Sequence, residues 1–405
     1  MAPGRAADRC RDAGVTTAHP GLVGGPIYLD YNATTPVDPA VVEAMTPYLA
    51  AHFGNPSSVH AYAHPARAAL DRARNQVAEL IGAAGEQILF VASGSEANNL
   101  AIRGAVLASG QDRAHVITQP TEHPAVLNTC RALARLHGAE ITYLPVDREG
   151  LIDPAELAAA ITPRTVLVSI MAANNETGVV QPVADLARVA HEHGALLHTD
   201  AAQAAGKVPL DVATSGVDLL TVVGHKMYAP KGVAALYVRA GVALEPVIYG
   251  GGQEHGLRAG TENIALAVAL GTAARLAADD LAAGGDHRLQ ALRDRLHQRL
   301  ADALPDRVVL NAHPDRRLPN TLNVSVDGVR GDELLAAVPE VAASTGSACH
   351  AGATEPSPVL QAMGLSRDRA LAALRLSVGR WTTEHDIDNA AGRLSIGALT
   401  LMTRC

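Results

Sequence analysis

Short apolar runs alternate with helix-like segments through much of this chain, and this alternation restricts the fold more than any other feature. Apolar residues first recur at helical spacing from Leu70 to Ile81. Strand-like runs then follow, separated mostly by Ala-rich or amphipathic segments, at Gln87–Val91, His115–Thr118, Ile141–Val146, Val166–Met171, Ala195–Thr199, Leu219–Val223 and Val233–Val238. Continuous apolar strands between helices require a sheet that is covered on both faces. The pattern therefore predicts an α/β fold with a largely parallel sheet.

The residue composition and pattern change near residue 262, which predicts a second, smaller α+β domain. Residues 264–304 are rich in Ala and Leu with charged residues on the other face, as in long helices. A strand-like run at Leu322–Val326, a Gly/Ser/Pro-rich stretch at 344–358 and a final helical region follow. Residues 1–26 show no periodicity and no signal-peptide core, so we expect a flexible tail there.

The composition excludes several functional classes. Hydrophobic residues make up 48% of the 405 residues, and the net charge of -8 without a long basic run argues against nucleic-acid and membrane-surface binding. No apolar stretch reaches the roughly 18 to 20 residues that span a bilayer. The cysteines, Cys10, Cys130, Cys349 and Cys405, form no CxxC pair, so we expect neither a metal site nor a disulfide framework. A cytoplasmic protein with lone thiols fits best.

A Gly/Ser turn follows the first apolar run, at Ser93-Gly94-Ser95-Glu96. A turn of this kind from a strand into a helix directs backbone N–H groups and hydroxyls at one point. Together with the helix dipole it forms a site suited to phosphate. An ordinary helix N-cap is the alternative interpretation of this segment.

Two charged residues lie at the ends of later apolar runs. Asp200, with Gln203 three residues on, follows the run at 195–199, and Lys226 follows the run at 219–223. A strand-end carboxylate can keep a pyridinium nitrogen protonated, and a partly desolvated lysine amine forms Schiff bases. Taken singly, Asp200 is equally compatible with a helix N-cap and Lys226 with a solvated loop. The phosphate cradle, the aspartate and the lysine together fit one ligand, pyridoxal 5'-phosphate.

One cysteine differs from the others in its surroundings. Cys349 lies among small residues in the sequence Ser344–His350, which favours an accessible, reactive thiol. Cys10 and Cys405 lie near the termini, and Cys130 lies within a helical pattern, so we expect these three to be bystanders.

A histidine and an arginine are further candidates. His123 follows the run at 115–118 and is suited to stack on a flat ring or to shuttle a proton; an ordinary loop histidine is the alternative. Arg375 alternates with apolar neighbours and is expected to pair with an anion. That anion is either a ligand carboxylate or a partner in a structural salt bridge.

These segments together resemble the cysteine desulfurases and the related selenocysteine lyases, which are pyridoxal-phosphate enzymes of the class V aminotransferase fold. The resemblance covers residues from about 27 to 385. It rests on the segments Tyr28–Pro36, Phe53–Ser58, Gly94–Leu100, Thr121–His123, Asn174–Gln181, Thr199–Gln203, Gly224–Gly232, Gly250–Thr261 and Gly346–Cys349. It implies a fold type I transferase, with a tail at 1–26, a large cofactor domain at 33–281, and a small domain of 27–32 and 282–405 that carries the thiol loop.

The resemblance also implies a role for individual residues. Lys226 matches the lysine that bonds to the cofactor, Asp200 the partner of its pyridine nitrogen, and His123 the residue that stacks on the ring and moves protons. The remaining cofactor positions are Gly94, Ser95 and His225 at the phosphate, Asn175 and Gln203 near the ring, and Thr261 supplied by the partner subunit of a homodimer. Arg375 matches the clamp for the substrate carboxylate, Asn32 is a second substrate contact, and Cys349 is the thiol that becomes a persulfide.

The activity expected from this resemblance is conversion of L-cysteine to L-alanine, with the sulfur delivered to an acceptor protein. A selenocysteine lyase is the alternative of the same class. Val223, which replaces a common phosphate-binding Ser, and the Cys349-His350 pair favour that subgroup. Pro124 argues against it, because it replaces the Asp that commonly follows the histidine in the animal enzymes. A non-catalytic scaffold or sulfur-carrier subunit is the alternative of another class, against which Lys226, Asp200 and Cys349 argue.

Overall fold

A computed structural model describes residues 18–346 and 355–403 of the chain. Of the tail predicted for residues 1–26, residues 1–17 lie outside the described residues. The rest of it is structured: Pro20–Leu22 form a 3-10 helix, the Nε2 atom of His19 bonds the Val37 carbonyl at 2.9 Å, and the His19 ring contacts Trp381. The predicted tail therefore does not extend to residue 26.

A seven-stranded sheet forms the centre of the larger part of the molecule, in the order β2-β8-β7-β6-β5-β3-β4. Its strands are β2 (Ile88–Val91), β3 (His115–Thr118), β4 (Glu140–Tyr143), β5 (Thr165–Ser169), β6 (Leu196–Asp200), β7 (Leu219–Val223) and β8 (Ala234–Val238). Neighbours pair in parallel except that β8 is antiparallel to both β2 and β7. The predicted, largely parallel α/β sheet is thus confirmed, and the carboxyl ends of its other six strands share one edge.

Helices cover both faces of this sheet because its strands are apolar on both sides. In β2, for example, Ile88 and Phe90 pack into one hydrophobic cluster while Leu89 and Val91 pack into another. The first cluster includes side chains of α3 (Ala63–Leu80), α6 (Pro154–Ala160), α7 (Val183–Glu192), α8 (Val212–Ser215) and α9 (Ile264–Ala282). The second includes α4 (Gly94–Ala108) and α5 (Pro124–His137). Because helices cover both faces of the sheet, only the ends of its strands are accessible to a ligand.

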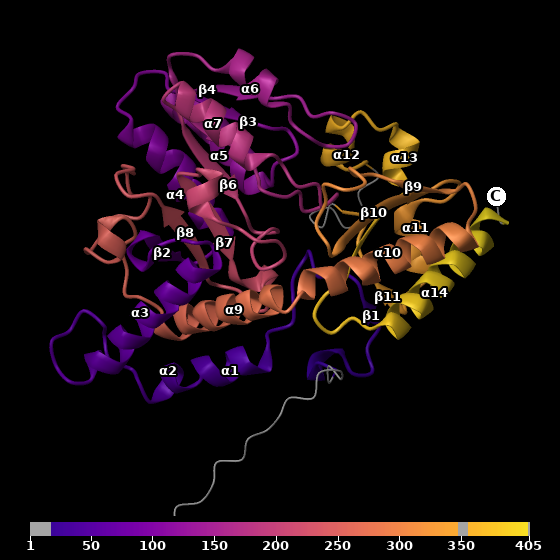
Figure 1. Cartoon of the computed structure of the whole chain (residues 1–405), viewed down its shortest axis with the longest axis horizontal. Helices are drawn as coiled ribbons and strands as arrows, with labels where there is room; N and C mark the ends of the chain where they lie inside the picture. Colours follow the sequence, from indigo (N-terminus) through magenta and orange to yellow (C-terminus); the bar gives the residue numbers. More distant parts are fainter. Residues whose placement is uncertain (1–17, 347–354, 404–405) are drawn as a thin grey trace, which may run out of the picture.

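A smaller part, at the right of Figure 1, has its own core. Its strands are β9 (Val308–Leu310), β10 (Thr321–Val326) and β12 (Ala373–Ser377) in an antiparallel sheet, with β1 (Ile27–Tyr28) paired in parallel to β11 (Val341–Ala342). Its helices are α10 (Gly285–Ala303), α11 (Gly331–Ala337), α12 (Pro358–Ala362), α13 (Arg367–Leu371) and α14 (Glu384–Met402). Leu296, Leu322 and Leu394 share one cluster here. The exact domain limits stay a prediction.

Two more helices, α1 (Pro39–Met45) and α2 (Pro47–Ala50), lie beside α9 at the lower edge of Figure 1. The predicted helical stretch at 264–304 forms α9 and α10, which break at Ala283-Gly284, where Gly284 adopts a positive φ of 77°. Within the described ranges, no helix is both long and apolar enough to cross a membrane.

Candidate active site

One cavity of about 380 Å³ lies at the edge of the large sheet where the parallel strands end. It brings together most of the predicted site residues: Asn32, Gly94, Ser95, His123, Asn175, Asp200, Gln203, His225, Lys226 and Arg375. Thr261 is exposed and is not among the residues that line it. Cys349 lies outside the described residues, although Gly346, at the start of its segment, lines the cavity.

Asp200 ends β6 and is buried at the floor of this region. Its carboxylate accepts hydrogen bonds from the Asn98 side chain at 2.7 Å and from the Ala202 backbone at 2.9 Å. Asn98 is fixed in turn, because its side-chain oxygen accepts from Thr221 at 2.7 Å. Asn98 was not predicted as a site residue. In the sequence it lies one turn into the helix that follows Gly94, inside the Gly94–Leu100 segment that carries the resemblance.

Lys226 follows β7 in a short 3-10 helix, Gly224–Lys226. Its amine donates to the backbone carbonyls of Asn32 at 2.6 Å and Ala33 at 2.7 Å. Burial, aided by the positive charge of Arg375, lowers the pKa of Lys226 to about 8. Lys226 is therefore not the solvated loop lysine of the alternative interpretation, and its neutral, nucleophilic form is accessible near neutral pH.

The Ser93–Glu96 turn opens the 15-residue helix α4, and the N-cap interpretation of it is confirmed, while the phosphate site stays a prediction. The Ser93 hydroxyl accepts from the Glu96 N–H as an N-cap at 3.1 Å. A side chain at Gly94 would place its Cβ atom 2.6 Å from Val223, so only glycine fits at this point.

His225 contacts Thr34 at 3.2 Å, and burial lowers its pKa to about 4, which keeps the imidazole neutral.

His123 is the N-cap of α5 and is exposed at the side of the cavity. Its Nδ1 atom accepts from the Ala125 N–H at 3.1 Å, so the proton of the neutral ring belongs on Nε2. Desolvation by the surrounding protein lowers the pKa of His123, although Asp200 opposes this effect. Pro124 occupies the first helical position, where its fixed φ and missing N–H are favourable, which gives this departure from the relatives a local structural role.

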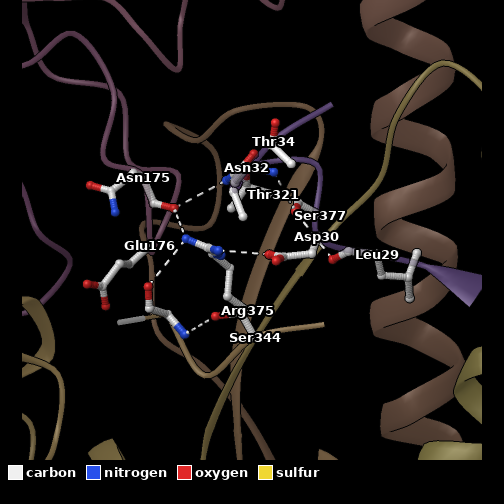
Figure 2. Close-up of polar contacts among 12 residues, drawn as sticks. Leu29, Asp30, Asn32, Thr34, Asn175, Glu176, Thr321, Ser344, Arg375 and Ser377 are labelled. Carbon is white, nitrogen blue, oxygen red and sulfur yellow. Dashed lines mark hydrogen bonds and ion pairs between the residues drawn. The ribbon is translucent and has the colours of Figure 1, made fainter. Parts of the chain in front are cut away.

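Arg375 lies in β12, and Figure 2 shows its guanidinium between Asp30 and the Asn175 carbonyl. It pairs with the Asp30 carboxylate at 2.8 Å and donates to the carbonyls of Asn175 at 3.1 Å and Gly346 at 3.3 Å. The structural salt bridge is thus present, and its carboxylate, Asp30, was missed by the sequence reasoning. Because Asp30 and Arg375 are 345 positions apart, no local pattern could have paired them.

The sequence profile of the aminotransferase class-V family matches residues 27–390. The chain belongs to the aminotransferase class-V family. It is 46% identical to a cysteine desulfurase of Homo sapiens over 95% of this chain and 85% of that protein. It is also 46% identical to the cysteine desulfurase IscS of Anaeromyxobacter dehalogenans, over 90% of each chain.

Two solved structures agree with this assignment. A NifS-like protein superimposes with a TM-score of 0.85 at 34% identity, covering 92% of this chain and 98% of that one. The structure titled "SspA in complex with cysteine" superimposes with a TM-score of 0.77 at 38% identity, covering 88% and 99%. The fold type I class expected from the sequence is therefore confirmed.

Class-V aminotransferases and cysteine desulfurases depend on pyridoxal phosphate, and the cavity fits such a group. It combines a buried carboxylate acceptor in Asp200, an amine with a lowered pKa in Lys226, and a helix N-terminus at Gly94 where a side chain would clash. The carboxylate suits a ring N–H, the amine suits an aldehyde, and the helix N-terminus suits a phosphate.

Proposed function

We propose that this chain is a pyridoxal-phosphate-dependent cysteine desulfurase. The observation that carries the proposal is the amine of Lys226, deprotonated more easily than an ordinary lysine, in the same strand-end cavity as the buried Asp200 carboxylate. Family membership and the identity to cysteine desulfurases over nine-tenths of the chain support removal of sulfur from cysteine as the reaction of this site.

The cofactor end of the cavity would act through four side chains. When bound, pyridoxal phosphate draws electrons away from the α-carbon of an amino acid. Asp200, held by Asn98, would accept the ring N–H and keep that nitrogen protonated. Lys226 in its neutral form would accept the α-proton, and His123, with its proton on Nε2, would move a second proton.

The substrate end would recognise the amino acid by its carboxylate. The guanidinium of Arg375 offers a planar set of donors, and Asn32 and Asn175 lie beside it. The Cys349 thiolate would then attack the substrate sulfur: an S–S bond forms, the C–S bond breaks with its electron pair left on carbon, and protonation of that carbon gives alanine. The sulfur remains on the enzyme as a persulfide.

The partners follow from the same proposal. We expect the enzyme to work as a homodimer of the cytoplasm, in which Thr261 of each chain, exposed here, would bind the phosphate held by the other chain. The persulfide passes its sulfur to an acceptor protein. The large domain at 33–281 would carry the cofactor, and the small domain of 27–32 and 282–405 would carry Arg375 and the thiol.

A turnover assay with two substrates tests the proposed function. Purified protein loaded with pyridoxal phosphate is given L-cysteine or L-selenocysteine with a reducing acceptor, and alanine is measured. We expect sustained alanine release from L-cysteine. Release from L-selenocysteine alone would show a selenocysteine lyase instead, and no release from either amino acid would overturn the assignment as an enzyme of this class.

A further inference from the structure

The chain uses lysine very sparingly. Of its 33 lysines and arginines, only Lys207, Lys226 and Lys231 are lysines, and all the others are arginine. Lys231 is exposed, whereas Lys207 is only 8% exposed. Lys207 is therefore a buried primary amine in a chain that otherwise relies on arginine.

Lys207 is linked to the cofactor lysine through two intermediates. Its amine donates to the side-chain oxygen of Gln203 at 2.7 Å. The Gln203 amide nitrogen donates to the backbone carbonyl of Asn32 at 2.9 Å, and this same carbonyl accepts from Lys226 at 2.6 Å. Lys207 and Lys226 also line one small cavity of about 130 Å³, separate from the larger one.

This chain of contacts fixes the orientation of an amide. When Lys207 is protonated, its ammonium group donates hydrogen bonds and accepts none, so the Gln203 atom that faces it is oxygen. The Gln203 nitrogen must then face Asn32 and the larger cavity, which Gln203 lines. The Asn32 carbonyl only accepts and requires the same orientation, so Lys207 and Asn32 together hold the Gln203 amide.

We propose that Lys207 is a positioning residue: together with the Asn32 carbonyl it holds the Gln203 amide at the cofactor cavity, and its charge is coupled to that of Lys226. The inference rests on the proposed function, because Gln203 is the group through which Lys207 would act on the cofactor.

The surroundings of Lys207 favour such coupling. Burial, followed by the positive charges of Lys226 and Arg375, lowers the pKa of Lys207 to about 7. Among the described residues, no carboxylate lies within ion-pair distance of the amine. The other charged groups that line its cavity are Asp280, Asp286, Arg288 and Arg380, and Arg380 is already paired with Asp280. Lys207 and Lys226 are therefore two amines that compete for protons in one buried region.

The first experiment measures this coupling in the apoprotein. Lysine amines are acetylated briefly across a pH series, and each of the three lysine peptides is quantified by mass spectrometry. In the wild type, labelling of Lys207 should rise through about pH 7, well below an ordinary lysine. In Lys226→Met the midpoint for Lys207 should move upward, because a repelling charge is gone. Exposed Lys231 serves as the internal reference.

Two outcomes of this experiment would overturn the coupling. One is a Lys207 midpoint that is the same in the wild type and in Lys226→Met. The other is Lys207 labelling that follows the same pH curve as Lys231. Neither readout requires catalysis, so the coupling can fail while alanine release succeeds, or the reverse.

The second experiment measures the positioning role. The Kd for pyridoxal phosphate is determined from its absorption for Lys207→Met, Lys207→Arg and Lys231→Met. Lys207→Met should weaken binding by about 3- to 10-fold, the effect of one oriented hydrogen bond. Lys207→Arg, which also only donates, should recover most of the affinity, and Lys231→Met should match the wild type. An unchanged Kd in Lys207→Met, or equal losses in the methionine and arginine variants, would overturn the role.

Discussion

The two ends of the cavity are built in different ways. The cofactor end uses residues at or just after the ends of neighbouring strands, so that Asp200 and Lys226 meet because β6 and β7 pair in parallel. The substrate end collects Asp30, Asn175 and Arg375 from three distant stretches of chain. One end therefore depends on the register of a single sheet, and the other depends on how the smaller part packs against it.

The two ends also differ in what controls the charges of their side chains. At the cofactor end, burial dominates: it lowers the pKa of Lys226 to about 8 and raises the pKa of Glu122 to about 8. At the substrate end, the charge of Arg375 is balanced directly by Asp30. Substitutions at the first end should change proton transfer, and substitutions at the second should change substrate affinity.

The largest expected effect is at the cofactor end. Lys226→Ala should lower alanine formation from L-cysteine by about 1,000-fold or more, because it removes both the nucleophile and the base. Steady-state alanine release from the purified variant measures this, with the exposed Lys231→Met variant as the control for loss of a lysine. Turnover near the wild-type rate would show that Lys226 is not the cofactor lysine.

At the substrate end we expect a smaller effect, confined mainly to KM. Arg375→Lys should raise KM for L-cysteine by about 10- to 100-fold, since a point charge replaces a bidentate fork. Asp30→Asn should raise KM by only about 3- to 10-fold, because the guanidinium stays but loses the partner that positions it. Initial rates over a range of cysteine concentrations separate KM from kcat. A loss in kcat with KM unchanged would contradict the division between the two ends.

The smallest effect concerns the stability of the cofactor end. Glu122 is buried, accepts from Gln119 and from the Met171 N–H, and has a pKa raised to about 8 in the folded chain. The folded state therefore keeps a proton that the unfolded chain releases at a lower pH, so this stabilisation is present at low pH and is lost as pH rises toward about 8. In Glu122→Gln that decline should vanish, a difference of a few kcal/mol across this pH range.

Urea unfolding from pH 4.5 to 9 measures this difference, with the wild type and Glu122→Gln compared at about ten pH values. Parallel stability curves for the two proteins would show that Glu122 does not keep its proton in the folded state. Asp30→Asn, from the substrate end, is the comparison variant.

The same contrast explains what the sequence could reveal. The strand ends at Asp200 and Lys226 were predicted because apolar runs mark strands, and parallel strands bring their carboxyl ends together. Asp30 was missed because its pairing with Arg375 depends on tertiary packing. The short strands β1 and β11 were missed for the same reason, since two residues carry no periodicity. The resemblance implied that Arg375 binds the substrate carboxylate, but it did not indicate that Asp30 already pairs with Arg375.

The central claim is that this cavity removes sulfur from cysteine and passes it to Cys349. The most direct measurement is a single turnover of the loaded enzyme with L-cysteine, in which alanine is quantified and persulfide is mapped to individual cysteines by mass spectrometry. We predict equal amounts of alanine and of persulfide on Cys349, none on the buried Cys130, and no persulfide in Cys349→Ser, which keeps the cofactor's visible absorption. Alanine formed without sulfur on Cys349, or full sulfur release by Cys349→Ser, would contradict the claim.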